Sequence, residues 1–141
     1  MPAVIVDVPL RWADLDPYGH VNNVAVVGLL EQARILALWN GSESALPALD
    51  PASSVQVIVA DVGVTYLRPI TLDVPAANVA VSVESVGGAS FVLAYEVWAA
   101  GVLSARATTT LALVDAATGV PVRLEPAARA RLRELTAAPP L

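Results

Sequence analysis

The sequence contains no cysteine and no lysine, and His20 is its only histidine. The absence of cysteine excludes disulfide bonds, thiolate catalysis and metal sites built from cysteine. The absence of lysine excludes Schiff-base and P-loop chemistry, which depend on an ε-amino group. A single histidine has no second histidine with which to build a zinc site. We therefore predict no metal site and no cofactor.

Basic residues and long apolar runs are also scarce. The net charge is −5, and all eight basic residues are arginines, which argues against general nucleic-acid binding. The run "VAVVGLL" is far shorter than the roughly 18 apolar residues that a membrane-spanning helix needs. The N-terminus has no basic stretch followed by a long apolar region, so it does not resemble a secretory signal. We expect a cytoplasmic protein without a membrane span.

The chain is nevertheless rich in apolar residues. Its composition is 56% hydrophobic and 15% charged, which excludes disorder. At 141 residues it fits one domain, residues 1–141, with a real core. The apolar content is high for a free monomer of this size. Part of the apolar surface is therefore expected to lie in a subunit interface or a ligand groove. Trp12, Trp39 and Trp98 are expected to pack in the core or in an interface.

The order of elements predicts an α+β fold. A strand over residues 3–13 is followed by the turn "DPYG", by a helix over residues 24–39 and by "NG" as its stop. Four strands follow in an antiparallel meander, over residues 55–68, 78–87, 89–100 and 102–114, with tight turns at Gly87-Gly88 and Gly101. "RPITLDVPAAN" should form a loop. The tail, residues 126–141, reads as a short helix to about residue 136 and a flexible end.

The helix over residues 24–39 is apolar nearly all round. Only Glu31, Gln32 and Arg34 interrupt its apolar surface. A helix of this kind that is too short to span a membrane is expected to be buried on most sides. One sheet that wraps around one helix would bury it in this way.

The stretch "RWADLDPYGHVNN" carries the strongest candidates for chemistry. Asp14 and Asp16 are two residues apart, so they point the same way while the strand persists. Asp16 also directly precedes a turn and the start of a helix. Its carboxylate either begins the turn or caps the helix. Alternatively, it acts on a carbonyl that the helix-end N–H groups polarise, by attacking it or by activating water.

The neighbours of Asp16 have similar double interpretations. His20 is either a turn residue hydrogen-bonded to backbone or a catalytic group. Asn22 and Asn23 are mainly candidates for the helix N-cap. A Ser-His-Asp triad has no support, because the sequence lacks a G-x-S-x-G elbow.

The roles of three charged residues farther along the chain also have more than one interpretation. Glu31 and Arg34 are three apart on the helix and can form a structural pair. Glu31 is alternatively a buried functional acid, since its neighbours are apolar. Arg68, at a strand end in "YLRPI", either reaches a ligand phosphate or is a solvated or ion-paired side chain.

Together these stretches resemble the hotdog-fold acyl-CoA thioesterases of the 4-hydroxybenzoyl-CoA thioesterase type. The shared elements are a strand ending in D-x-D, then G-H-V-N-N, then a long helix ending in E-x-A-R. "VADVGVTYLRPI" is similar to the next strand of that family, and "VESVGGASFVLAYEVW" to the hairpin after it. The resemblance covers roughly residues 5–115.

The resemblance implies an antiparallel sheet wrapped around one central helix, and a homodimer whose sheets join edge to edge, with a dimer of dimers as the larger assembly. It implies an acyl-CoA substrate at the subunit interface, Asp16 as nucleophile or base, and the backbone N–H at Asn23 as donor to the thioester carbonyl. Asp14 would be supporting, and His20 and Asn22 would shape the loop. The further substrate-binding candidates are Asn22, Val24, Arg68 and Ser90.

Two departures bear on the substrate. The turn "YGHVNN" is similar to that of thioesterases acting on fatty acyl-CoA, which favours aliphatic acyl groups. "LDVPAAN" replaces an acid-containing "GD", so the loop that contacts the ligand is altered. An acidic surface favours CoA over an acidic carrier protein. The alternatives are a hotdog hydratase or dehydratase, and a non-catalytic module that binds acyl thioesters.

Overall fold

The computed structural model describes residues 3–39 and 44–136. Its elements, in chain order, are β1 (Ala3–Pro9), a short 3-10 helix (Trp12–Asp14), α1 (Asn23–Leu38), β2 (Val55–Tyr66), β3 (Ala76–Val86), β4 (Ser90–Ala99), β5 (Val102–Asp115) and α2 (Pro126–Glu134). This order confirms the predicted α+β class. The predicted stop at residues 40–41 and the flexible end lie outside the described residues.

The five strands form one antiparallel sheet in the order β1-β3-β4-β5-β2. The meander from β3 to β5 occupies its centre, and β2 forms one edge, where it pairs only with β5. Ala100 and Gly101 both have positive φ, at 52° and 75°, as a two-residue hairpin turn between β4 and β5 requires. The turns predicted at Gly87-Gly88 and Gly101 are therefore confirmed.

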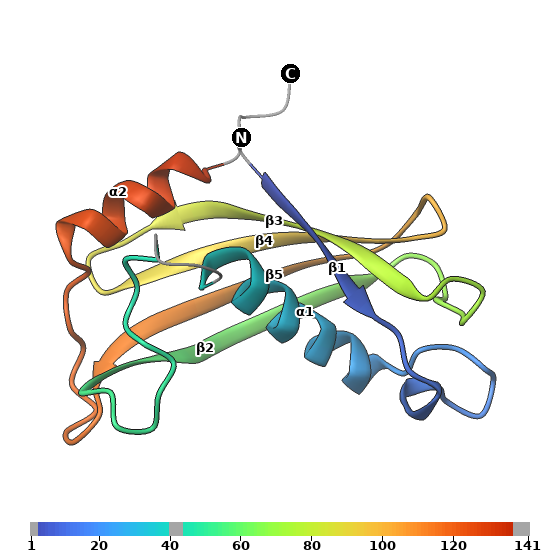
Figure 1. Ribbon diagram of the computed structural model, residues 1–141, viewed down its shortest axis with the longest axis horizontal. Helices are drawn as coiled ribbons and strands as arrows, with labels where there is room; N and C mark the ends of the chain where they lie inside the picture. The colour runs from blue at the N-terminus through green and yellow to red at the C-terminus, as the bar shows by residue number, and fades with distance from the viewer. Residues whose placement is uncertain (1–2, 40–43, 137–141) are drawn as a thin grey trace.

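Helix α1 lies across the face toward which the sheet curves (Figure 1). Its Leu29, Leu30 and Ala33 are almost completely buried against the sheet. Side chains alternate along a strand, so every second residue of β4 reaches this core, including Phe91 and Leu93. The core thus fixes the position of α1 relative to the central strands.

The helix is not buried on most sides, contrary to the expectation. Val24 is 75% exposed, and Val27, Ile35 and Leu36 are each about two-fifths exposed. The sheet covers only one side of α1, since a single layer of strands cannot enclose a helix. The all-round apolar sequence therefore leaves an apolar surface on α1 in the single chain.

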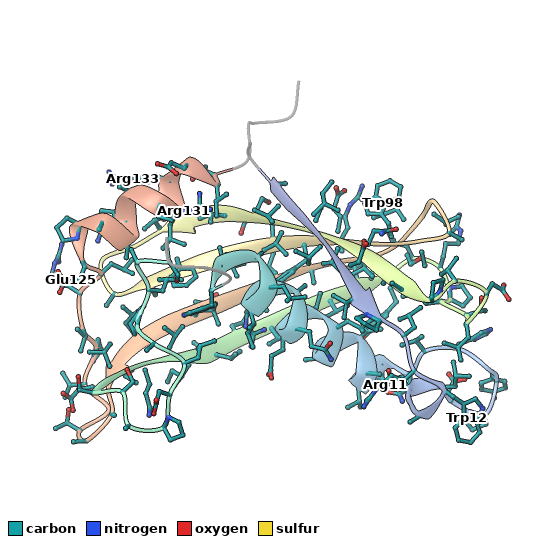
Figure 2. The ribbon with its side chains drawn as sticks, in the orientation of Figure 1. Arg11, Trp12, Trp98, Glu125, Arg131 and Arg133 are labelled. Atoms are coloured by element: carbon teal, nitrogen blue, oxygen red, sulfur yellow. The ribbon has the colours of Figure 1, made fainter. Side chains whose placement is uncertain are left out.

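Helix α2 packs beside β3 at the end of the sheet farther from the start of α1 (Figure 1). Its Ala128 and Leu132 are buried, while Arg131 and Arg133 extend outward (Figure 2). The backbone then returns to the sheet, where the N–H of Val83 donates to the carbonyl of Leu135 over 2.9 Å. Neither described helix is long and apolar enough to cross a membrane.

The first strand was predicted over residues 3–13, but β1 ends at Pro9 and residues 12–14 form a 3-10 helix. Asp14 and Asp16 consequently do not share a strand face. Trp12 is 81% exposed and projects from this loop (Figure 2). Trp39 and Trp98 are half-buried. Of the two positions predicted for Trp12, the core or an interface, the structure therefore excludes the core.

Replacing Leu30 by alanine tests how α1 is held on the sheet. Leu30 is completely buried, so Leu30→Ala should lower the free energy of unfolding by about 2–5 kcal/mol through lost apolar burial and a cavity. Val24→Ala on the exposed side of the same helix is the control, with an expected change within about 0.5 kcal/mol. Urea unfolding measures both, and equal losses would contradict the one-sided burial of α1.

Candidate active site

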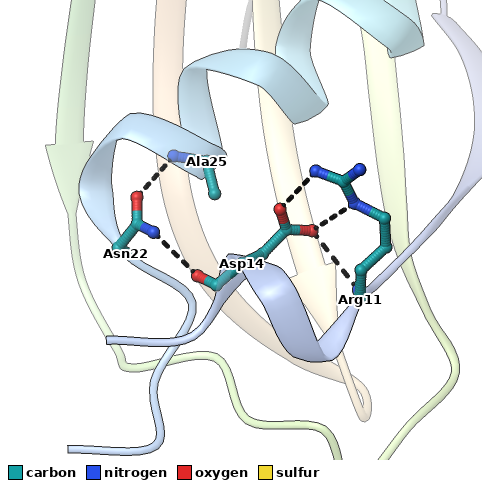
Figure 3. A network of polar contacts seen from close by, with 4 residues as sticks. All are labelled: Arg11, Asp14, Asn22 and Ala25. Carbon is teal, nitrogen blue, oxygen red and sulfur yellow. Dashed lines mark hydrogen bonds and ion pairs between the residues drawn. The ribbon is translucent and has the colours of Figure 1, made fainter. Parts of the chain in front are cut away.

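The start of α1 is fixed by one asparagine side chain. Asn22 is the N-cap residue, and its Oδ1 accepts a hydrogen bond of 2.7 Å from the N–H of Ala25. Its Nδ2 donates to the carbonyl of Asp14 over 3.0 Å, and its backbone N–H donates to the same carbonyl over 2.8 Å (Figure 3). Asn22 therefore ties the first turn of the helix to the loop before it. Of the two predicted cap candidates, it is the one that caps.

A charged pair holds that loop. The Arg11 guanidinium donates to both Asp14 carboxylate oxygens, with Nη2 to Oδ1 at 2.7 Å and Nε to Oδ2 at 3.2 Å (Figure 3). The Asp14 side chain is buried, whereas Arg11 remains largely exposed. The hydrogen bond from Arg11 holds the pKa of the Asp14 carboxyl below its usual range, although burial acts in the opposite direction. Asp14 thus has a supporting role in the loop.

Asp16 closes the predicted turn. Its Oδ1 accepts from the backbone N–H of Tyr18 at 2.8 Å and from that of His20 at 3.1 Å. The backbone N–H of Gly19 donates to the Asp16 carbonyl over 3.1 Å, and Gly19 has φ +78°, which favours glycine. Among the described residues, all hydrogen bonds to the Asp16 carboxylate end on Oδ1. Oδ2 has no hydrogen-bond partner among them.

A pocket of about 310 Å³ lies beside this turn. Asp16, His20 and Asn23 line it from the loop and the start of α1, and Tyr66 and Arg68 line it from the end of β2 and the following loop. Four of the residues predicted from the sequence are thus brought together: Asp16, His20, Asn23 and Arg68. Arg68 is exposed, and its Nη1 donates to the carbonyl of Leu67 over 2.8 Å.

The other predicted residues lie elsewhere. Asn22 and Val24 line an adjoining hollow of about 510 Å³ on the outer side of α1. Ser90 starts β4 opposite Ala112, whereas the pocket lies near Ala105 on the same neighbouring strand. Seven strand residues separate these positions, or about 23 Å. Ser90 of the same chain therefore does not line this pocket.

A larger hollow of about 770 Å³ lies on the sheet face opposite α1. Small residues line most of it, together with Glu84, Glu96 and Arg106, and none of the predicted site residues lines it. Its size alone therefore does not make it the reaction site, since the carboxylate and the helix start are at the smaller pocket.

Among the pocket residues that the sequence analysis missed, two have polar side chains, Tyr66 and Ser104. The Tyr66 hydroxyl donates to the carbonyl of Asn23 over 3.1 Å and so joins the end of β2 to the first turn of α1. The only signal for it was the aromatic residue before Arg68 in "YLRPI". Ser104 had no signal of its own, because it reaches the site through strand pairing.

The first turn of α1 has two N–H groups without an acceptor among the described residues. The N–H of Asn22 and that of Ala25 are both satisfied, as given above. The N–H groups of Asn23 and Val24 are not, as expected for the open end of a helix. Asn23 also lines the pocket, together with Asp16. Such a donor and a carboxylate suit reaction at a polarised carbonyl.

Glu31 and Arg34 form the predicted structural pair, with 3.6 Å between Glu31 Oε2 and Arg34 Nη2. The Glu31 side chain is 65% exposed, so the alternative of a buried functional acid is wrong. The buried member is Arg34. No cluster of three or more candidate metal ligands occurs among the described residues.

Comparison with known proteins decides the family. A model of the thioesterase-like superfamily matches residues 10–132, which include the whole site loop, α1 and four of the five strands, β2 to β5. The chain belongs to the thioesterase-like superfamily. No curated protein sequence matches it.

Solved structures are similar over nearly the whole length of this thioesterase-like protein. A thioesterase from Thermus thermophilus, complexed with coenzyme A and zinc, is 32% identical, covers 98% of this chain and 96% of its own, and has a TM-score of 0.72. A predicted thioesterase from Bacillus stearothermophilus is 20% identical over 98% of this chain and 99% of its own, with a TM-score of 0.79.

A third similar structure is a DHNA-CoA thioesterase from Staphylococcus aureus, 22% identical over 94% of this chain and 92% of its own, with a TM-score of 0.79. Together with the family match, these structures confirm the expected hotdog fold. The family match and the Thermus thermophilus relative also confirm that the protein is a thioester hydrolase.

Replacing the N-cap residue tests which asparagine caps α1 in this thioesterase. Asn22→Ala removes the acceptor for the Ala25 N–H and should lower the free energy of unfolding by about 0.5–2 kcal/mol. Asn23→Ala changes the neighbouring asparagine, which does not cap the helix, and is expected to cost less. Thermal and urea unfolding give the comparison. A larger loss for Asn23→Ala would contradict the assignment of the cap.

The Arg11–Asp14 pair predicts a pH dependence. Because the folded pKa of Asp14 is depressed, its stabilisation is present above the unfolded value, about 3.9, and is lost as pH falls through the lower folded value. Native protein should therefore exceed Asp14→Asn in free energy of unfolding at neutral pH, and the difference should shrink under acid conditions. The pKa of Asp115 is also lowered, but Asp115 is present in both proteins, so its contribution to the pH dependence cancels in the difference between them. A difference independent of pH would contradict the assigned pair.

Proposed function

We propose that this thioesterase hydrolyses acyl-CoA to a free carboxylic acid and CoA, with Asp16 as nucleophile or general base. The observation that carries the proposal is the shared pocket of Asp16 and Asn23. Asp16 Oδ2 has no hydrogen-bond partner among the described residues. The backbone N–H of Asn23, at the adjoining helix start, also has none. Together they suit a thioester whose carbonyl lies between them.

In the general-base route, Asp16 takes a proton from a water molecule that attacks the thioester carbon. The Asn23 N–H donates to the carbonyl oxygen, on which negative charge develops, and the positive end of the helix dipole adds to this stabilisation. The carbon–sulfur bond then breaks, and the proton passes to the CoA sulfur. In the nucleophilic route, the Asp16 carboxylate attacks the carbon itself, the carbon–sulfur bond breaks and the CoA thiolate leaves and takes up a proton. Water then hydrolyses the resulting anhydride, which releases the carboxylic acid and restores the Asp16 carboxylate.

The local turn prepares Asp16 for either route. Its two hydrogen bonds from backbone N–H groups fix the carboxylate through Oδ1. A fixed carboxylate requires little reorganisation when the substrate binds. His20 lines the same pocket and is proposed to shape the loop, in which its N–H is one of the two donors.

Coenzyme A is the proposed thiol carrier because the Thermus thermophilus relative is complexed with it. Arg68 lines the pocket and is exposed, so its guanidinium is available to a CoA phosphate. Asn22 and Val24 line the hollow next to the pocket and are proposed to contact substrate there. No cofactor takes part in this proposal.

A homodimer is proposed from the exposed apolar surface, with a dimer of dimers as the larger assembly. β2 is an edge strand of 12 residues, and Ile58, Val59 and Val62 are exposed on it. Beside it, α1 exposes Val27 and Ile35. Unpaired strand edges and apolar patches of this kind favour association. In a dimer, Ser90 would meet a substrate only at the site of the other copy.

Asp16→Asn tests the reaction. The change keeps the shape of the side chain but removes the charge, and it should reduce kcat by about 10²–10⁴. Release of CoA thiol from a panel of acyl-CoA substrates is the measurement. Asp50→Asn is a matched control, because Asp50 also precedes a proline and also accepts from the N–H two residues on, at 2.7 Å.

Three results would overturn the proposal. Undiminished turnover by Asp16→Asn would contradict the role of Asp16. Saturable binding of acyl-CoA by the native protein without hydrolysis would favour the non-catalytic module. Hydration of crotonyl-CoA that is lost in His20→Ala would favour the hydratase.

A further inference from the structure

Tyr66 connects the two walls of the pocket. Its hydroxyl donates to the carbonyl of Asn23 over 3.1 Å, and both residues line the pocket with Asp16. Among the described residues, no other hydrogen bond joins α1 to β2. A second link between the walls is made by backbone alone, from the N–H of Val21 to the carbonyl of Ile70 over 2.8 Å. Tyr66 is therefore the side chain through which the edge of the sheet holds the start of the helix.

A β-bulge in β2 directs Tyr66 toward the helix. The register of β2 against β5 shifts between Val59 and Asp61, so one residue of β2 is extra. After the shift, Tyr66 lies opposite Ala105, which is buried on the α1 face of the sheet. Without the extra residue Thr65 would take this place, because side chains alternate between the two faces. Bulges beside functional sites often re-aim a side chain in this way.

The Tyr66 hydroxyl contributes little to the core. Tyr66 is 51% exposed, and its hydrogen bond with Asn23 is exposed to solvent as well. Water competes for such a bond, so its net contribution to folding is small. Tyr95, by contrast, is almost completely buried, and its hydroxyl lies 2.7 Å from that of Thr109. The position of Tyr66 therefore favours a role at the pocket over a role in folding.

The acceptor of this hydrogen bond is a peptide unit at the open end of the helix. The carbonyl of Asn23 and the N–H of Val24 belong to the same planar peptide. That N–H and the N–H of Asn23 have no acceptor among the described residues. A donor on the carbonyl restrains the peptide plane and polarises its N–H. Tyr66 therefore acts on the donors that can polarise a substrate carbonyl.

We infer that Tyr66 is a positioning residue for polarisation of the thioester carbonyl. Its hydroxyl holds the first peptide of α1 at a fixed distance from β2, so the open N–H groups of Asn23 and Val24 keep their orientation when acyl-CoA binds. The inference rests on the proposed acyl-CoA hydrolysis and adds one residue to it. Tyr66 acts through the helix start and does not itself contact the reacting atoms.

Tyr66→Phe tests the inference, because it removes the hydroxyl and keeps the ring. The variant should lower kcat for acyl-CoA hydrolysis roughly tenfold, since a small misplacement of a polarising group has effects of this order. KM should change little, because the lost interaction matters mainly in the transition state. Tm should also change little, since the hydrogen bond is exposed. Release of CoA thiol and thermal unfolding are the measurements.

Tyr95→Phe is the matched control. It also removes a hydrogen-bonded tyrosine hydroxyl, but from a buried position of β4 that does not line the pocket. This change should lower Tm, because the Thr109 hydroxyl loses its partner in the core. It should leave kcat and KM unchanged. The two tyrosine variants are thus expected to give opposite patterns of stability and activity.

Infrared spectroscopy of bound substrate adds a measurement that a purely structural role of Tyr66 would not affect. Octanoyl-CoA with a heavy carbon isotope at the thioester carbonyl is bound to Asp16→Asn, in which turnover is slow. Its carbonyl band should lie at lower frequency than in free octanoyl-CoA, because the helix-start N–H groups polarise the bond. Adding Tyr66→Phe to this variant should reduce the downshift, whereas adding Tyr95→Phe should leave it unchanged.

Unchanged kcat in Tyr66→Phe would contradict the inference. A raised KM with unchanged kcat would also contradict it, since that result indicates direct contact of Tyr66 with the substrate. An unchanged carbonyl band on adding Tyr66→Phe would show that any loss of kcat has another origin. Failure of the native protein to hydrolyse any acyl-CoA would instead overturn the proposed function, and the infrared comparison then judges Tyr66 separately.

Discussion

The hydrogen bonds of one asparagine hold the site together. Asn22 uses its side-chain oxygen to cap α1 and its side-chain nitrogen to bind the Asp14 carbonyl, so helix and loop are positioned by the same residue. Because the Asn22 side chain accepts from the N–H of Ala25 and from no other donor of that turn, the N–H of Asn23 has no acceptor among the described residues, and Asn23 lines the pocket with Asp16. The Arg11–Asp14 pair stabilises the loop from its other side.

The second constraint is that one sheet layer covers only one side of α1. The covered side forms the core, with Leu29 and Leu30, and the other side leaves apolar residues in contact with solvent. The candidate site lies at the start of this helix, and the proposed dimer surface includes its uncovered side. The two are therefore neighbours, because the sheet covers only part of the same helix.

Local patterns predicted much of the fold and part of the site. "DPYG" specifies its turn through short-range backbone geometry, and Asp16, His20 and Asn23 meet at the pocket because they belong to one loop and the adjoining helix start. Tyr66 and Ser104 were missed, since they reach the pocket by strand pairing across long stretches of sequence. Ser90 illustrates the converse: it is adjacent to a recognisable hairpin but lies at the other end of the sheet.

The sequence by itself determined the α+β order, the hairpin turns, the start of α1 and the acid at that start. These depend on backbone preferences and on periodicity within a few residues. Only the tertiary structure decided which side of α1 is buried, because its apolar residues surround the axis and do not select a side. It also decided that Arg34, and not Glu31, is the buried charge, since that depends on where β4 and β5 pass beneath the helix.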